Sequence, residues 1–96
     1  MFIRSIRHKG LKRLVEDNDA RGIDGRLIGR VRRIITALVL ADDMNAFIDF
    51  APPGWRIHQL SGDRQDTWSV SVSGNWHITF DEDTGQLDFL NLKDYH

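Results

Sequence analysis

The stretch TWSVSVSGNWHITF, residues 67–80, decides the fold of this chain. On both sides of its Ser-Gly-Asn centre, apolar and polar residues alternate with a period of two, which predicts a β-hairpin with one buried face. The two apolar sets share a face if residues 73–75 form a three-residue loop, whereas a two-residue turn at residues 74–75 needs a bulge to restore the register. The predicted pairs are Trp68 with Phe80, Val70 with Ile78, and Val72 with Trp76.

The hairpin has a second, polar face that is left open for chemistry. Its residues are Ser69, Ser71, His77 and Thr79. The apolar face, in contrast, requires a cover, because a sheet face of this kind is stable only when it is buried against another element.

The first forty residues supply that cover as two helices. Residues 2–6 are predicted to form a short strand, and residues 8–17 have the spacing of a short amphipathic helix. A longer helix follows, and Asp24 is its predicted N-cap. Its apolar residues recur at intervals of three and four, as in a buried stripe. The stripe consists of Leu27, Ile28, Val31, Ile34, Ile35, Leu38 and Val39.

The remaining residues predict short strands. Residues 42–54 are predicted to be a connector, because the Pro-Pro-Gly at its end is incompatible with a helix. In residues 55–60, alternation places Trp55 and Ile57 inward and Arg56 and His58 on the open face, and residues 86–92 form a last strand. The sequence thus predicts one α+β domain, residues 1–96, with both N-terminal helices packed on one face of a small, antiparallel-dominated sheet of about four to five strands.

Composition limits the kind of protein this is. The 96 residues contain no cysteine, so a single modest core without disulfides is expected. The N-terminus lacks the apolar core of a signal peptide, and no apolar run is long enough to span a bilayer, so we expect a soluble, cytoplasmic protein without a membrane partner. Residues 1–40 hold ten Lys or Arg and four Asp or Glu, whereas residues 41–96 hold three and ten. The basic half is suited to phosphate or to an acidic partner.

The histidines do not predict a metal site. His8, His58, His77 and His96 are spread along the chain, and no two have the short spacing of zinc ligands. The chain has no glycine-rich phosphate loop and no serine nucleophile motif. We therefore expect neither a metal nor a cofactor.

The open face does gather groups that suit RNA cleavage. Strand parity places Arg56, His58 and His77 on it, and the tail, residues 94–96, follows the last strand and can reach the same face. Cleavage through the 2′-hydroxyl needs a base, an acid and cations that stabilise the pentavalent phosphorane. The alternative is that residues 94–96 are an ordinary surface tail.

Three segments resemble the HigB-like branch of the RelE/ParE toxin superfamily. They are PGWRIHQLSGDR at residues 53–64, WSVSVSGNW at residues 68–76 and DYH at residues 94–96, and IRSIRHKGL at residues 3–11 adds to them. The resemblance covers essentially the whole chain. It implies a RelE-like fold and a ribonuclease toxin that enters the ribosomal A site, cuts mRNA there by 2′-hydroxyl attack and is neutralised by a cognate antitoxin encoded beside it.

The matching positions imply roles for individual residues. His58 and His96 are the implied acid and base. Asp94 would orient or tune a histidine, Tyr95 would stack on a base or position the nucleotide, and Arg64 would contact phosphate.

Two positions depart from the family pattern. The chain has Ser61 where lysine is common and His77 where arginine is common. Both departures remove permanent positive charge where the phosphorane develops, so reduced activity is expected unless Arg56 compensates or His77 is protonated.

Two alternatives stay open at this point. One is a non-enzymatic toxin on the same fold, such as the gyrase-inhibiting branch, whose members generally lack the histidine and the terminal DYH. The other is a weakened toxin that mainly binds its antitoxin and helps to regulate the operon.

Overall fold

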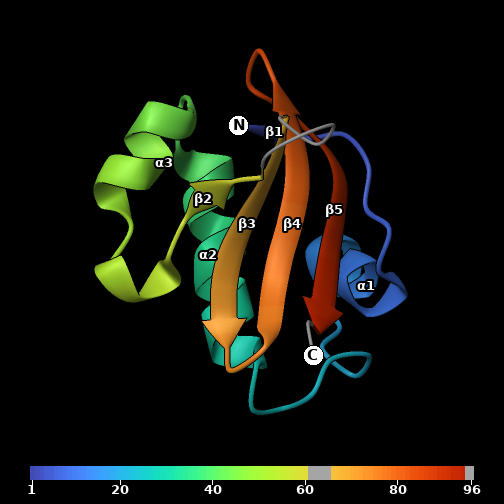
Figure 1. Ribbon diagram of the computed structural model, residues 1–96. Helices are drawn as coiled ribbons and strands as arrows, with labels where there is room; N and C mark the ends of the chain where they lie inside the picture. The colour runs from blue at the N-terminus through green and yellow to red at the C-terminus, as the bar shows by residue number, and fades with distance from the viewer. Residues whose placement is uncertain (61–65, 95–96) are drawn as a thin grey trace.

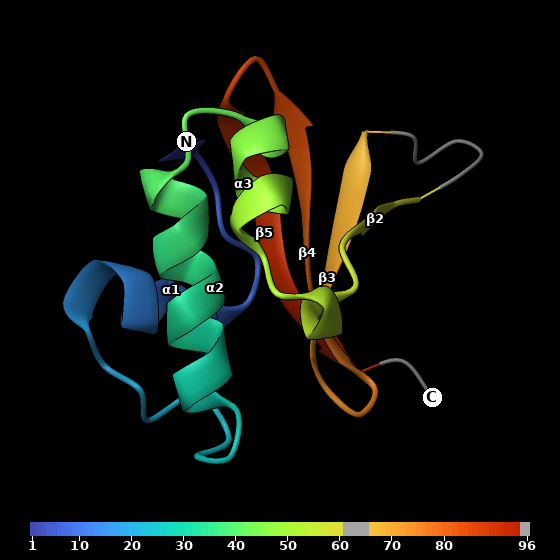
Figure 2. The ribbon, with the colours of Figure 1, turned by 90° about the vertical axis from the view of Figure 1, so that its left-hand side faces the viewer.

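The computed structural model, which describes residues 1–60 and 66–94, is a five-stranded sheet with helices α1 and α2 on the same side (Figures 1 and 2). The elements are β1 (Phe2–Ile3), α1 (Lys9–Asp17), α2 (Ile28–Leu40), α3 (Met44–Phe50), the 3₁₀ helix η1 (Pro53–Trp55), β2 (His58–Gln59), β3 (Thr67–Ser73), β4 (Trp76–Asp83) and β5 (Gln86–Asp94). The strand order is β1-β5-β4-β3-β2. Only the β1–β5 pair is parallel among these strands. The predicted α+β architecture is therefore confirmed.

The hairpin of β3 and β4 forms the middle of the sheet. Trp68 pairs with Phe80 and Val70 pairs with Ile78, as the alternation predicts. Val70, Ile78 and Phe80 are almost completely buried. Their burial against the helices accounts for the choice of register, since a slip by one residue would turn them all to solvent.

The predicted third pair and the three-residue loop are wrong. Ser73 belongs to β3 and pairs with Trp76, so that residues 74–75 alone form the turn. A bulge between Ser71 and Ser73 compensates for the shorter turn, and Val72 stays buried with 2% of its surface exposed. Gly74 supplies the positive φ, 55°, that the tight turn requires.

A second bulge lies in β5. Thr79 pairs with Asn91, but Asp81 pairs with Asp88, so β5 contains one extra residue in this interval. The backbone at Phe89 has a φ of 57°, and its side chain is 46% exposed. A phenylalanine in the left-handed region is unusual, because its Cβ crowds the following carbonyl.

The core fills the space between the helices and the sheet. Completely buried members include Leu11 of α1, Val31, Ile34 and Leu38 of α2, Phe47 of α3, and Leu87 and Leu90 of β5. Most of the predicted α2 stripe is buried, but Val39 is 48% exposed, because the stripe ends at Leu38 on the last turn. No helix within residues 1–60 and 66–94 is long and apolar enough to cross a membrane.

The helix starts differ from one another in their caps. His8 caps α1, because its Nδ1 accepts a hydrogen bond of 3.0 Å from the Leu11 amide. The prediction that Asp24 caps α2 is wrong. α2 begins at Ile28, and the Asp24 carboxylate instead accepts hydrogen bonds from the amide and the guanidinium of Arg26.

The connector predicted for residues 42–54 contains a helix, so that prediction is also wrong. Asp43 caps α3 by accepting a hydrogen bond of 2.8 Å from the Ala46 amide. Met44 and Phe47, three residues apart, face the core. Pro52 and Pro53 follow the end of α3 and begin η1, so they do not prevent the helix.

Candidate active site

The open face of the sheet, opposite α1 and α2, brings two of the predicted residues together around a serine. His58 of β2 pairs with Ser69 of β3. The Ser69 hydroxyl lies 3.2 Å from Nδ1 of His77 on β4. Two histidines that are nineteen positions apart in the sequence are thus placed on one surface by strand pairing.

The tautomer of His58 follows from its neighbour. Nδ1 of His58 lies 3.1 Å from the main-chain oxygen of Arg56, which can only accept, so Nδ1 carries the hydrogen. In the neutral ring, Nε2 is then the nitrogen with a free lone pair. Because His58 is exposed, this nitrogen is suited to take a proton from a bound ligand.

His77 is the less accessible of the two histidines. Partial burial lowers the pKa of His77, and the nearby positive charge of protonated His58 lowers it further. His77 is therefore mainly neutral at pH 7, and it lacks the permanent charge of an arginine.

Arg56 does not belong to a strand, so the predicted alternation over residues 55–60 is wrong at its beginning. Trp55 ends η1 and Arg56 is its C-cap, with a φ of 46°. The strand itself comprises only two residues, His58–Gln59. The Pro-Pro-Gly segment bends the chain here, and the left-handed residue turns it toward β3. Arg56 thus contacts the His58 ring through its main-chain oxygen. Its side chain is exposed and lies outside β2.

The structure places a further cation on this face, Lys93, which the sequence pattern did not predict. Lys93 of β5 pairs with His77 across β4 and β5, and Asn91 pairs with Thr79. Both residues alternate with the buried Leu90 and Leu92, so they lie on the open face. Strand parity in residues 86–94 is the signal that would have identified them.

A cleft of about 350 Å³ opens on the same face. The residues that line it include Thr67, Thr79, Asn91 and Lys93 from the three long strands. Phe89 also lines it, and the guanidinium carbon of Arg7 lies 4.7 Å from the centre of the Phe89 ring. The cleft therefore combines polar side chains and one carboxylate, Asp81, with an exposed aromatic ring.

Charge differs between the two ends of this face. His77 and Lys93 lie toward the Gly74 turn, and His58 lies level with Ser69 and Thr79, near the middle of β3 and β4. A hollow at the other end is lined by five acidic residues, Asp66, Asp81, Glu82, Asp83 and Asp88, together with Arg4. A phosphate group is consequently favoured at the histidine end and repelled at the acidic end.

Asp94 lies elsewhere than predicted. It is the last residue of β5 instead of the first residue of a tail, and it pairs with Trp76. Strand alternation places it on the opposite side of the sheet from Lys93. The expectation that Asp94 reaches the open face is not met by this register, because β5 is two residues longer than predicted.

The remaining predicted residues, Arg64, Tyr95 and His96, lie outside the described residues, as does Ser61. Within residues 1–60 and 66–94, no group of three His, Cys, Asp or Glu side chains is placed to hold a metal ion.

Comparison with known proteins agrees with the resemblance noted in the sequence. Residues 4–96 match a family model described as the RelE-like toxin of the type II toxin-antitoxin system HigB. Endoribonuclease HigB of Proteus vulgaris is 34% identical over 95 residues, which cover 99% of this chain and 100% of that protein.

Solved structures support the fold independently. A crystal structure of a YafQ mutant from E. coli superposes with a TM-score of 0.60 at 15% identity, covering 96% of this chain and 90% of YafQ. A second E. coli YafQ structure gives a TM-score of 0.58 at 13% identity over the same shares. Since the family model spans nearly the whole chain and the curated relative is more than 30% identical over its full length, this protein belongs to the HigB-like family of RelE-like type II toxins.

Proposed function

We propose that this protein is the toxin of a type II toxin-antitoxin pair and that it cleaves mRNA on the ribosome. In the proposed reaction, the 2′-oxygen of the nucleotide attacks the adjacent phosphate without a metal or cofactor. The observation that carries the proposal is that His58, the strand partner of Ser69, and His77, which contacts the Ser69 hydroxyl, share the open face in a chain 34% identical to an endoribonuclease.

His58 is the proposed general base. Its Nδ1 hydrogen is held by the Arg56 carbonyl, which leaves Nε2 to accept the proton of the 2′-hydroxyl. The new bond forms between the 2′-oxygen and phosphorus, and the bond from phosphorus to the 5′-oxygen breaks. His96 is the proposed acid that returns a proton to this leaving oxygen. Tyr95 is proposed to position the nucleotide. Asp94 is given no role on the open face, because its register places it on the opposite side of the sheet from Lys93.

The developing phosphorane charge needs cations, and Lys93 supplies one that is permanent. Lys93 pairs with His77 and lines the cleft. Arg56 and Arg64 are proposed to contribute further phosphate contacts. Because His77 is mainly neutral at pH 7, we expect slower cleavage than an arginine at this position would give.

The cleft beside the histidines is the proposed binding site for the nucleotides that flank the cut bond. The Phe89 ring offers a surface on which a base can stack, and Asn91 offers hydrogen bonds to a base edge. The acidic end of the face limits how far the strand can extend, since it repels phosphate.

The ribosome is proposed to be recognised by the N-terminal helices. Residues 1–40 carry about six more positive than negative charges, and such a surface attracts ribosomal RNA phosphates. The proposed place of action is therefore the cytoplasm, where ribosomes translate mRNA.

Purified ribosomes programmed with a defined mRNA test this proposal directly. The wild-type protein should cut the mRNA in the A site, as mapped by primer extension, and His58→Ala or His96→Ala should abolish the cut. Intact mRNA after incubation with folded wild-type protein would reject the enzymatic function. Inhibition of gyrase by the same preparation would then favour a non-enzymatic toxin.

A further inference from the structure

The helical side of the molecule has an apolar groove that plays no part in the proposed reaction. It has a volume of about 370 Å³ and lies between α2 and the α3–η1 segment. Its apolar lining comes from Ala37, Leu40, Phe50, Pro52 and Trp55. Figure 2 shows α2 on one side of the sheet. His77 alternates on β4 with the buried Ile78, so it lies on the other side, which His58 shares through its pairing with Ser69.

Two large apolar side chains at this groove are unusually exposed. Leu40 is 76% exposed and Phe50 is 70% exposed. The Phe50 ring stands edge-on to Trp55, with 6.4 Å between the ring centres, and Trp55 is itself buried against Phe47. Phe50 is thus held in place by the core although it contributes little to it. An exposed aromatic side chain held in this way is typical of a binding surface.

The apolar surface continues across α2. A second hollow of about 340 Å³ lies between α2 and α1 and is lined by Leu14, Val15, Ile35 and Val39. Arg32, Thr36 and Leu40, each four residues apart, line both hollows. They form a ridge with an apolar groove on either side, a shape that fits a helix laid along it.

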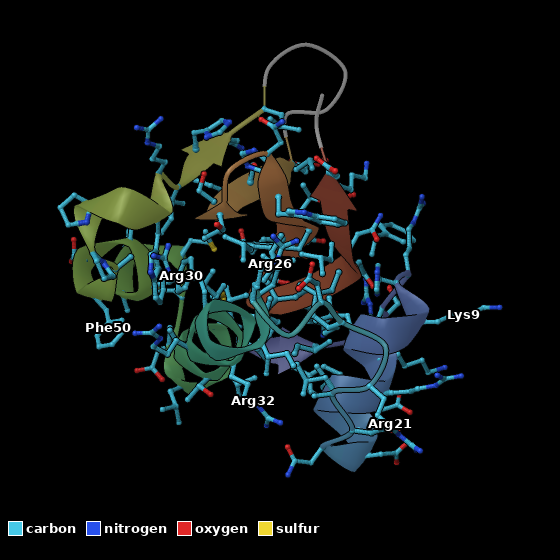
Figure 3. All side chains as sticks on the ribbon, turned by 90° about the horizontal axis from the view of Figure 1, so that it is seen from below. Lys9, Arg21, Arg26, Arg30, Arg32 and Phe50 are labelled. Atoms are coloured by element: carbon cyan, nitrogen blue, oxygen red, sulfur yellow. The ribbon has the colours of Figure 1, made fainter. Side chains whose placement is uncertain are left out.

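Positive charge borders the groove. Arg32 and Arg33 line it, and Arg30 lies one turn earlier on α2. Figure 3 shows Arg32 and Phe50 extending outward from the helical side. Within residues 1–60 and 66–94, ion pairs are present at Arg4, Arg21 and Arg26, but none is present at Arg30, Arg32 or Arg33. Arg32 donates a hydrogen bond to the Asn18 side chain and Arg33 donates one to the Gly29 carbonyl, but these acceptors are neutral, so the charges can still attract acidic side chains of a partner.

We propose that this groove receives an amphipathic helix of the cognate antitoxin. Apolar residues of that helix pack against Leu40 and Phe50, and its acidic residues face Arg30, Arg32 and Arg33. The inference rests on membership of a type II toxin family, which implies an antitoxin partner, and it does not depend on the cleavage reaction. An antitoxin bound here covers the basic helices and leaves the histidine face uncovered.

The test measures binding of the purified cognate antitoxin in the absence of RNA. Phe50→Ser combined with Leu40→Ser should weaken binding on the order of a hundredfold, because two exposed apolar contacts are removed. Ile48→Ser is the matched control, because Ile48 is also an exposed apolar residue of α3 but does not line the groove. This control should bind as tightly as the wild type.

Charge is tested separately. Arg33→Glu should weaken antitoxin binding and reduce its dependence on salt, whereas Lys9→Glu on the exposed surface of α1 should not. Unchanged affinity of the double serine variant would overturn the proposal. The proposal would also be overturned if the double serine variant lost self-association but kept its antitoxin binding. That result would identify a second copy of this chain as the occupant of the groove.

The ribosomal cleavage assay provides an independent readout. If the wild type cleaves mRNA, the single variant Phe50→Ser, which lies outside residues 1–40, should also cleave it but should be inhibited much less by the antitoxin. Binding can be measured equally well in a His58→Ala background, so a failure of the proposed enzymatic function would leave this test intact.

Discussion

The Ser69 hydroxyl lies 3.2 Å from Nδ1 of His77, and together the two side chains occupy the centre of the open face. The pair is held by β3 and β4, and the His77 ring is desolvated enough to lower its pKa. A neutral ring at this position provides a hydrogen-bonding group but no permanent charge. The chemistry of the site thus depends on what replaces that charge.

His77→Arg should increase the rate of mRNA cleavage by roughly tenfold to a hundredfold, because a permanent cation then stands where the phosphorane forms. Adding Ser61→Lys should increase the cleavage rate further, because it restores the second positive charge that the family pattern has and this chain lacks. The rates are measured in single-turnover experiments on programmed ribosomes. His77→Gln serves as the control, and it should give no gain because it adds no charge. A rate for His77→Arg no higher than that of the wild type would show that the site works by another arrangement.

Lys93→Gln should have the opposite effect. Lys93 is the strand partner of His77 and lines the cleft, so its removal deprives the proposed site of a cation that the structure places there. We expect kcat to fall about tenfold or more with a smaller change in KM. Lys12→Gln is the comparison variant, because it removes a charge from the proposed ribosome-contacting surface of α1 and should change KM instead of kcat. Equal kcat values for Lys93→Gln and the wild type would remove Lys93 from the mechanism.

Acidification should destabilise the fold through His8. Burial lowers the pKa of His8, and the neutral ring accepts the capping hydrogen bond from Leu11. Since the folded-state pKa lies below the unfolded value of about 6.5, the unfolded chain binds more protons in this range. The contribution of His8 is therefore complete above about pH 6.5 and is lost as the pH falls through the folded pKa.

The measurement is urea unfolding at pH 7.5 and at pH 5.5. His8→Asn keeps a capping side chain that does not titrate, so this variant should lose less stability than the wild type between the two pH values. His77 shows the same direction of shift and titrates in both proteins, so it cancels in the comparison. Identical pH dependence of the two proteins would show that the His8 cap is not pH-sensitive.

The sequence was most informative where a pattern is local. Alternation in residues 67–80 was sufficient to identify two of the three hairpin pairs, and the spacing in α2 identified most of its buried residues. The turn was not predictable in this way, because a three-residue loop and a two-residue turn with a bulge both keep Val72 buried. The side of the sheet on which Asp94 lies depends on where β5 ends, and alternation does not define that residue.

Two further features depend on contacts that are distant in the sequence. The helix α3 is only seven residues long, too short for a clear period, and Phe47 is fixed by packing on Trp55. Lys93 becomes part of the site because β5 pairs with β4 next to His77. The sequence predicted that His58 and His77 share a face, but it did not predict that Ser69 lies between them.

Phe89→Gly should separate the role of this ring from its contribution to stability. Its left-handed backbone costs about 1–2 kcal/mol, which glycine relieves. The contact with Arg7, at an exposed site, contributes about 0.5–1 kcal/mol and is lost. Because these terms oppose each other, the free energy of unfolding should change by no more than about 1 kcal/mol, as measured by urea denaturation.

If a base stacks on Phe89, the same variant should raise the KM for programmed ribosomes about tenfold. Phe2→Gly is a control for loss of an exposed aromatic ring, because Phe2 is 64% exposed and does not line the cleft. An unchanged KM for Phe89→Gly would exclude the ring from nucleotide binding.

Gly10→Ala should destabilise the protein, whereas Gly29→Ala should not. Gly10 lies in the first turn of α1, and a Cβ there would be 2.2 Å from the carbonyl oxygen of Gly22. The backbone must move to accept it, at a cost of about 1–3 kcal/mol. Gly29 lies in the first turn of α2, where an added Cβ would meet only the end of the Arg33 side chain at 3.9 Å. There the higher helix propensity of alanine should stabilise the protein by about 0.5–1 kcal/mol. Thermal unfolding of both variants gives the comparison, and equal effects of the two substitutions would show that the close approach of Gly10 to Gly22 does not constrain α1.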